Sequence, residues 1–219
     1  MRKLIIAGTT LILNFIVEVL VFLSLSIECV EMVFLLTYFL PLILFSPLIA
    51  TMAYLIKIEE LDLNEDIRTI IIKEIKNIPS SLFISVVSGL ATLSIFFSPL
   101  LPLSIASNTI GGYDGIGALA EAYIRFKKNI GRFLKRNFLY FLFSNTLIIA
   151  WSMIYSSLST ELASILSASV STLLLIVVIY RVLKEGLEYL AYGLKYCIYC
   201  ETLNPIEAKY CRQCGFKLK

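Results

Sequence analysis

Two pairs of cysteines near the C-terminal end of the sequence have the residue type and spacing of a metal site. The pairs are Cys197-x-x-Cys200 and Cys211-x-x-Cys214, with ten residues between them. Each Cys-x-x-Cys turn directs two sulfurs at one point, and two such turns supply the four thiolates of a tetrahedral zinc site. Gly215, directly after the second pair, allows the backbone to turn tightly. We therefore predict one structural zinc ion bound by these four cysteines.

The residues around the cysteines resemble the short zinc ribbons found at the ends of many archaeal and bacterial membrane proteins. Tyr196 and Tyr210 each precede a cysteine pair, as in that Tyr/Phe-Cys-x-x-Cys pattern, whereas Glu201 stands where those ribbons have glycine. The resemblance covers about Leu194 to Lys219 and implies a ribbon over residues 196–219. In such a closed site the metal holds a shape and does not catalyse. The ribbon is expected to fold on metal binding and to present a surface to a protein partner.

Two alternatives to zinc stay open at this point. The four cysteines could form disulfides, which persist in oxidising compartments and are rare in the cytoplasm. Iron in a rubredoxin-like sulfur site is the second alternative. Cys29, the fifth cysteine, lies far away in the sequence and is interpreted as a lone thiol. The compartment that contains the ribbon therefore decides between a metal and disulfides.

The composition excludes several kinds of enzyme. The 219 residues include no histidine, so a Ser-His-Asp or Cys-His nucleophile system and any histidine-bound metal are excluded. Of the residues, 58% are hydrophobic and 16% are charged, against about half and about a quarter in soluble domains. We therefore expect a membrane protein that is not an enzyme.

Six apolar segments are each long enough to cross a bilayer, which takes about 20 helical residues. Pro99 and Pro102 divide the long apolar stretch between residues 78 and 124, because proline cannot continue a helical hydrogen-bond ladder. The predicted fold class is an all-α polytopic membrane protein, with a six-helix transmembrane domain over 1–184, an interfacial helical linker over 185–195 and the ribbon. The predicted spans are 4–27, 31–56, 78–98, 102–124, 137–156 and 161–183.

The cations all lie on one side of this arrangement. The 19 lysine and arginine residues fall in the four segments that six spans place on the same side as the N-terminus. Cytoplasmic loops are enriched in Lys and Arg, so we expect the N-terminus and the ribbon in the cytoplasm. Arg2 and Lys3 before the first span also resemble a signal peptide, but the span is long and no small-residue cleavage site follows it. A cytoplasmic ribbon favours zinc over disulfides.

Two segments on the expected inner side are amphipathic or basic. Residues 61–78 carry isoleucines at helical spacing with cations on the other face, as in a helix that lies in the headgroup zone. The second segment carries six cations that we expect to bind anionic lipid headgroups: Arg125, Lys127, Lys128, Arg132, Lys135 and Arg136. Because this patch is short and lies close to the membrane, we expect no nucleic-acid partner.

Four polar residues fall inside the predicted spans, where an ionisable group is costly and marks a cavity or a partner. They form a candidate intramembrane polar site: Asn14, Glu18, Asp114 and Glu121. Glu18 and Asp114 could serve a proton or cation path; the alternative is that each is protonated or hydrogen-bonded within the bundle. Span 102–124 also carries small residues at helical spacing, where another helix can pack closely: Gly111, Gly115, Ala118 and Ala122. The glycines around Asp114 could break this helix, as transporters do at binding sites.

The six-span layout is similar to a broad family of prokaryotic membrane proteins, which includes the membrane domain fused to some glycerophosphodiester phosphodiesterases. The basic amphipathic segments before the later hairpins carry the similarity, for instance residues 126–134, Phe-Lys-Lys-Asn-Ile-Gly-Arg-Phe-Leu. The resemblance implies a membrane domain and no enzymatic activity.

These features favour an integral membrane scaffold or accessory subunit whose cytoplasmic zinc ribbon mediates protein interaction. The alternative is a small transporter or channel that uses Glu18 and Asp114. The sequence leaves open the identity of the partner or substrate, and also whether the chain forms a homo-oligomer.

Overall fold

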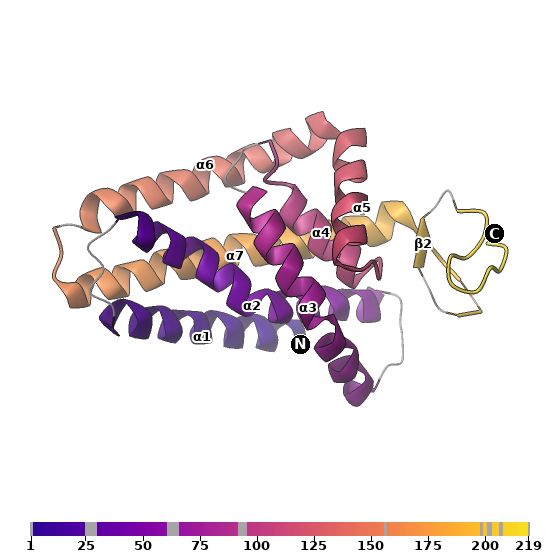
Figure 1. Ribbon diagram of the computed structural model, residues 1–219, viewed down its shortest axis with the longest axis horizontal. Coiled ribbons are helices and arrows are strands. Elements are labelled where there is room, and N and C mark those ends of the chain that lie inside the picture. Colours follow the sequence, from indigo (N-terminus) through magenta and orange to yellow (C-terminus); the bar gives the residue numbers. More distant parts are fainter. Residues whose placement is uncertain are drawn as a thin grey trace.

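The computed structural model describes residues 2–24, 30–60, 66–91, 96–155, 157–197, 199–200, 203–205 and 208–218 (Figure 1). The lone Cys29 lies outside these residues. Within them the chain forms helices and two short strands in the order α1 (Arg2–Ser24), α2 (Val30–Glu60), α3 (Ile67–Ala91), α4 (Leu100–Thr109), α5 (Gly115–Lys128), α6 (Ile130–Tyr155), α7 (Thr160–Gly193), β1 (Leu194–Tyr196) and β2 (Leu203–Pro205). The fold is therefore predominantly helical, as predicted.

Among the described residues, four helices are long and apolar enough to cross a membrane, and they run roughly along one direction (Figure 1). Their membrane-length stretches are Lys3–Ser24, Leu36–Glu60, Ile130–Tyr155 and Thr160–Leu190. These stretches correspond to the predicted spans 4–27, 31–56, 137–156 and 161–183. The last turn of α1, the first turn of α2, the end of α6 and the start of α7 lie at the same end of the molecule, opposite the C-terminal strands (Figure 1).

The predicted span 78–98 is not a separate helix in the described part of the chain. Its first part belongs to α3, which begins at Ile67 and also contains most of the predicted amphipathic segment 61–78. Pro79 lies inside this helix. The isoleucines at helical spacing continue directly into the apolar run, so one helix satisfies both patterns. Among the described residues, α3 is not one of the helices with the length and hydropathy of a membrane span.

The prediction of one helix over residues 102–124 is wrong. Helix α4 ends at Thr109 and α5 begins at Gly115, so the apolar run is divided into two short helices. Gly112 has φ of +64°, a left-handed conformation that glycine adopts without steric cost and that ends a helix. Asp114 then caps α5, because its carboxylate accepts a hydrogen bond from the N–H of Gly117 at 2.8 Å. We call residues 110–114 the helix break.

The predicted linker over 185–195 is also not a separate element. Helix α7 continues without interruption to Gly193, and the chain then enters β1 directly. Strand β1 pairs antiparallel with β2, with Lys195 opposite Asn204. The end of α7 is therefore joined to the four-cysteine segment with no flexible spacer between them.

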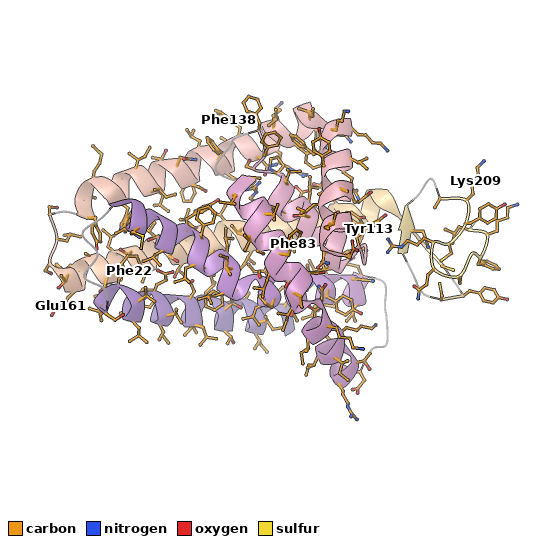
Figure 2. The ribbon with its side chains drawn as sticks, in the orientation of Figure 1. Phe22, Phe83, Tyr113, Phe138, Glu161 and Lys209 are labelled. Carbon is orange, nitrogen blue, oxygen red and sulfur yellow. The ribbon has the colours of Figure 1, made fainter. Side chains whose placement is uncertain are left out.

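Helix α7 lies at the centre of the packing and contacts α1, α2, α4 and α6. Ser164, Ser167 and Ser171 along α7 are small and buried, which allows α1 to approach closely. By contrast, α6 packs mainly against α7 and leaves large apolar side chains exposed, including Phe138, which points away from the bundle (Figure 2). A surface of this kind suits contact with lipid.

Candidate metal centre

The four cysteines meet at one point. Their Sγ atoms all lie within 4.8 Å of one another. The Sγ atom of Cys197 is 3.6 Å from that of Cys214, and the Sγ atoms of Cys200 and Cys211 are 3.4 Å apart. Zinc–sulfur bonds of about 2.3 Å in a tetrahedron place the sulfurs about 3.8 Å apart. The spacing of the sulfurs therefore fits a metal ion of this size.

The backbone positions each cysteine pair on a tight turn. Cys197 directly follows β1, so the strand pair fixes the start of the first turn. In the second turn the N–H of Gly215, at φ +70°, donates to the carbonyl of Cys211 at 2.9 Å. The N–H of Cys211 donates to the carbonyl of Phe216 at 2.7 Å, next to a bridge between Tyr210 and Lys217. The left-handed turn at Gly215 is the one that the sequence predicted.

The crowded sulfurs need a cation if all four are to be thiolates. Burial disfavours the Cys211 thiolate, but the backbone N–H groups of Cys214 and Gln213 lower the pKa of Cys211 to about 6. The N–H of Phe216 favours the Cys214 thiolate, but burial and the three neighbouring cysteines raise the pKa of Cys214 to about 12. A divalent cation among the sulfurs would remove this mutual repulsion, which is why thiolate ligands lose their protons on metal binding.

Asn204 contacts the second cysteine pair, a role that no motif in the sequence indicated. The side chain is 0% exposed, and its Nδ2 donates to the Sγ of Cys211 at 3.5 Å. Its Oδ1 accepts from the backbone N–H of Arg212 at 2.8 Å. A hydrogen bond to a metal-binding sulfur fixes the orientation of that sulfur and delocalises part of its negative charge. The sequence gives only a weak signal for this role, because Glu201 and Glu207 are also polar residues between the two cysteine pairs.

Arg212, between the two cysteines of the second pair, connects the metal centre to the helix break. Its Nη2 donates to the carbonyl of Gly111. The guanidinium group also lies over the ring of Tyr113, 4.3 Å from the ring centre. A Cβ atom at Gly112 would lie 3.3 Å from Nη2, so glycine leaves room for this approach. Carbonyl groups at the C-terminal end of a helix carry partial negative charge, which favours a cation there.

Several helices hold the helix break in place beneath Arg212. Asn108 of α4 donates to the carbonyl of Tyr113 at 2.7 Å, and Asn77 of α3 donates to Oδ1 of Asn108 at 2.7 Å. A Cβ atom at Gly111 would lie 2.8 Å from the hydroxyl of Tyr189 on α7. Tyr113 lies on the side of the helical body that faces the cysteine segment (Figure 2). The cysteine segment therefore docks on a part of the helical body that contacts from α3, α4 and α7 hold in place.

The candidate intramembrane polar residues fall in two places. Asn14 and Glu18 are buried where α1 packs against α7, and Asn14 donates to the hydroxyl of Ser171 at 3.1 Å. Asp114 is exposed and caps α5, while Glu121 is half-buried on α5. Asp114 and Glu121 thus belong to the helix break and α5, whereas Glu18 belongs to the α1–α7 interface.

The small residues predicted for helix packing line the buried face of the break and α5. Gly111, Gly115, Ala118 and Ala122 are all buried. A Cβ atom at Gly115 would lie 2.9 Å from the ring of Phe83 on α3. The stripe therefore lies where α5 packs against other helices, although it is divided by the break.

Part of the predicted lipid-binding patch is paired with acidic residues of α7. Arg136 forms ion pairs with Glu185 and Glu188, and Arg132 pairs with Glu188 at 3.2 Å. Arg125 lies over the ring of Tyr189 at 3.8 Å. Lys127, Lys128 and Lys135 are exposed. The sequence did not predict these pairs, because residues 185–195 were expected to form a linker separate from the last span.

Arg181 has a structural role that the sequence did not reveal. It is buried in α7 and donates to the carbonyl of Ser98 at 2.8 Å and to Oδ1 of Asn137. Ser98 belongs to the turn just before α4, and Asn137 belongs to α6. One arginine thus ties α6, α7 and the turn over residues 96–99 together.

No protein-family model matches the chain, and no curated protein or solved structure matches it either.

Proposed function

We propose that the chain is a non-enzymatic integral membrane scaffold or accessory subunit, whose C-terminal zinc ribbon lies in the cytoplasm and binds a protein partner. The four-sulfur cluster supports a structural ion, because a site with four protein ligands leaves no position for a substrate. Zinc is the metal that such a sulfur set in a reducing compartment most commonly holds. The resemblance of residues 196–219 to short zinc ribbons supports the same conclusion.

The observation that carries the proposal is an exposed aromatic surface beside the metal centre. The rings of Tyr199 and Phe216 are in contact, with centres 4.4 Å apart. Their side chains are 73% and 37% exposed, and Tyr210 is also exposed. These fractions apply while Arg212 holds the ribbon on the helix break. Aromatic residues are enriched at protein interfaces and often carry the binding energy, so this aromatic surface suits a protein partner.

The proposed membrane arrangement has four crossings, by α1, α2, α6 and α7. Helices α3 and α4 form a hairpin that stays on the cytoplasmic side, with its turn at the inner boundary, in place of the two further crossings that the sequence suggested. Four crossings, like six, put the N-terminus and the ribbon on one side. All lysine and arginine residues then still lie on the cytoplasmic side, in agreement with the positive-inside rule.

The contact between Arg181 and Ser98 supports this hairpin. Arg181 lies 21 residues after Thr160, the first residue of α7, or about 30 Å along a helix with a rise of about 1.5 Å per residue. The hydrocarbon core is about 30 Å thick. If α7 begins at the outer boundary, Arg181 lies at the inner boundary, and the turn over residues 96–99 lies there with it.

Helix α5 fits an interfacial position on the same side. It runs across the direction of α6 and α7 (Figure 1), and at 14 residues it is about 21 Å long, too short to cross. Arg125, Lys127 and Lys128 occupy its last turn. We propose that the exposed cations of α5 and α6 bind anionic lipid headgroups, each contributing about 1 kcal/mol.

The experiment that tests the partner proposal places a photoreactive amino acid at Tyr199 in native membranes. We expect one discrete crosslinked protein whose formation is lost when Phe216 is replaced by serine or when a chelator removes the metal. The matched control places the same group at Met153, an exposed position on α6. If position 199 gives no product, or the same products as position 153, the aromatic surface has no partner and the proposal fails.

The alternative of a transporter that uses both Glu18 and Asp114 has less support. Asp114 caps α5 at the surface, whereas Glu18 is buried between α1 and α7. In liposome flux assays we expect Asp114→Asn to leave any flux of a small cation unchanged. A flux that depends on both carboxylates would favour the transporter over the scaffold.

A further inference from the structure

Polar side chains from three helices meet inside the bundle at a place that the proposed function does not use. Asn14 and Glu18 lie one turn apart on α1 and are 0% and 1% exposed. Ser171 of α7 is 0% exposed, and Thr37 of α2 is 2% exposed. Packing forces alone favour apolar side chains at such positions, because a buried polar group without a partner is costly. The cluster therefore needs an explanation from its own chemistry.

The amide of Asn14 is held in one orientation by α7. Its Nδ2 donates to the hydroxyl oxygens of Ser171 and Thr172, both at 3.1 Å. The Thr172 hydroxyl donates in turn to the carbonyl of Ala168 at 2.8 Å. With the nitrogen turned toward these hydroxyls, Oδ1 of Asn14 is buried and has no hydrogen-bond partner in the part of the chain that the structure describes. This amide thus presents an acceptor oxygen inside the bundle.

Glu18 adds two further oxygens. Both carboxylate oxygens are buried with no hydrogen-bond partner among the described residues, although the Ser171 hydroxyl lies beside the carboxyl group. Two of the basic residues on these helices are engaged elsewhere: Lys3 of α1 pairs with Glu59 at 2.6 Å, and Arg181 of α7 binds Ser98 and Asn137. An ionised carboxylate in this position therefore has one uncompensated negative charge, which is strongly destabilising in a low-dielectric interior.

The structure also leaves a small space beside the cluster. A cavity of about 10 Å³ is lined by Thr37, Tyr38 and Ser171 together with apolar residues of α2 and α7. Within the described ranges, the hydroxyl of Thr37 is buried and has no hydrogen-bond partner. A cavity of this volume holds about one water-sized particle, so it has room for a small ion or for one water bound to it.

We propose that Glu18, Asn14, Ser171 and Thr37 form a binding site for one small monovalent cation, with sodium as the ion of matching size. The donors are hard oxygens, which suit alkali ions and not soft metals. One carboxylate balances one positive charge, so a monovalent ion leaves the site neutral. A calcium site generally uses six to eight oxygens and more negative charge. The site lies between α1, α2 and α7 and is independent of the ribbon.

The single tryptophan of the chain provides the readout. Trp151 of α6 is buried in a cluster with Phe22, one turn after Glu18, and with Leu174, close to Ser171. In purified full-length protein, sodium chloride is titrated against N-methylglucamine chloride at constant ionic strength and at neutral and alkaline pH. We expect a saturable change in tryptophan fluorescence and a rise in the melting temperature with sodium, and a smaller response with potassium.

Variants separate this site from non-specific salt effects. Glu18→Gln keeps the size of the side chain and should abolish the sodium response, while Ser171→Ala should weaken it. Glu161→Gln, at an exposed glutamate in the first turn of α7, is the matched control and should respond like the wild type. If Glu18→Gln does not fold, Glu18→Asp is the substitute. It keeps the negative charge, but its shorter side chain moves the carboxylate oxygens away from the other ligands and should weaken sodium binding.

Two results would overturn the proposal. A wild-type protein that responds to sodium no more than to N-methylglucamine at either pH would mean that the Glu18 carboxyl is simply protonated. A Glu18→Gln protein with an unchanged sodium response would mean that the ion binds elsewhere. Neither result affects the proposed role of the ribbon, because the measurement uses no partner and no residue of the metal centre.

Discussion

Arg212 is the single residue whose replacement best tests the coupling between the metal centre and the helical body. Arg212→Ala removes both the hydrogen bond to Gly111 and the contact with the Tyr113 ring. A hydrogen bond from a charged group is worth about 1.5–3 kcal/mol. We expect the docked state to lose about this much free energy, while the four ligands still bind metal. Hydrogen exchange should then rise at residues 111–114 and little elsewhere.

The matched control for this prediction is Lys209→Ala. Lys209 is an exposed cation of the same segment that lies outside the contact with the helix break. Its replacement changes the net charge equally and should leave exchange at residues 111–114 unchanged. Equal exchange in wild type and Arg212→Ala would mean that the Gly111 contact does not hold the ribbon.

At the residue scale, the sequence predicted ligands better than it predicted their supports. Spacing alone brought Cys197, Cys200, Cys211 and Cys214 together, because Cys-x-x-Cys turns constrain both members locally. Asn204 and Arg212 act through contacts with a turn or with the helix break, which depend on how the hairpins and helices pack. No local pattern encodes such contacts, so these residues could not be identified before the structure.

At the element scale, Glu74 predicts how stability depends on pH. It lies in the first half of α3, outside the candidate membrane spans, and accepts a hydrogen bond from Thr51 of α2 at 3.4 Å. Burial raises the pKa of Glu74 from 4.5 to about 7, which the hydrogen bond from Thr51 only partly offsets. The folded protein therefore keeps this proton at pH values where the unfolded chain has lost it.

The sign of the effect follows from proton binding. Between pH 4.5 and about 7 the folded state binds more protons, so the free energy of unfolding falls as the pH rises. The change is at most about 3.4 kcal/mol, since one pKa unit corresponds to about 1.4 kcal/mol. Melting temperatures in detergent should show this decline in the wild type and not in Glu74→Gln. Glu60→Gln, at the exposed end of α2, should keep it.

Helices were predicted correctly where the length of an apolar run and its hydropathy were the dominant signals in the sequence. Long apolar runs predicted α1, α2, α6 and α7 because length and hydropathy agree there. The run over residues 102–124 is also apolar over much of its length but contains Gly112 and Asp114, whose local conformations end one helix and begin another. The glycines around Asp114 already indicated that this helix could break. Which of the two signals prevails depends on the contacts of Tyr113 and Asn108 with their neighbours.

At the scale of the whole molecule, metal removal should affect both the ribbon and the helix break. A domain of this size has too small a core to fold without its metal, so chelation should unfold residues 197–218. Because Arg212 then loses its fixed position, exchange at residues 111–114 should rise as well. The candidate spans should keep their protection, since their packing does not involve the metal.

Cysteine variants provide the matched comparison for chelation. We expect one zinc ion per purified chain by elemental analysis, lost in Cys211→Ser and kept in Cys29→Ser. A protein that carries iron would show the colour of an iron–thiolate site. Unchanged exchange at residues 111–114 after complete metal loss would contradict the coupling between the ribbon and the break.

The number of crossings is the property of the whole molecule that the charge pattern could not determine. Six crossings and four crossings with a hairpin put the same lysines and arginines on the same side, because they differ only in the location of a turn without cations. The two arrangements differ in the position of Phe96, which is exposed in the turn over residues 96–99. With six crossings Phe96 lies outside the cell; with four crossings it lies near the inner boundary, beside Lys135.

Labelling of single cysteines in intact cells separates the two arrangements. In a Cys29→Ser background, a membrane-impermeant maleimide should label Ser159→Cys in the α6–α7 connection and should leave Phe96→Cys unlabelled. Lys127→Cys, at the end of α5, should react only after the membrane is opened, which verifies that the reagent stays outside. Labelling of Phe96→Cys to the same extent as Ser159→Cys would restore the six-crossing arrangement. The contact between Arg181 and Ser98 would then place Arg181 at the outer boundary, which conflicts with its position about 30 Å along α7 from the outer end of that helix.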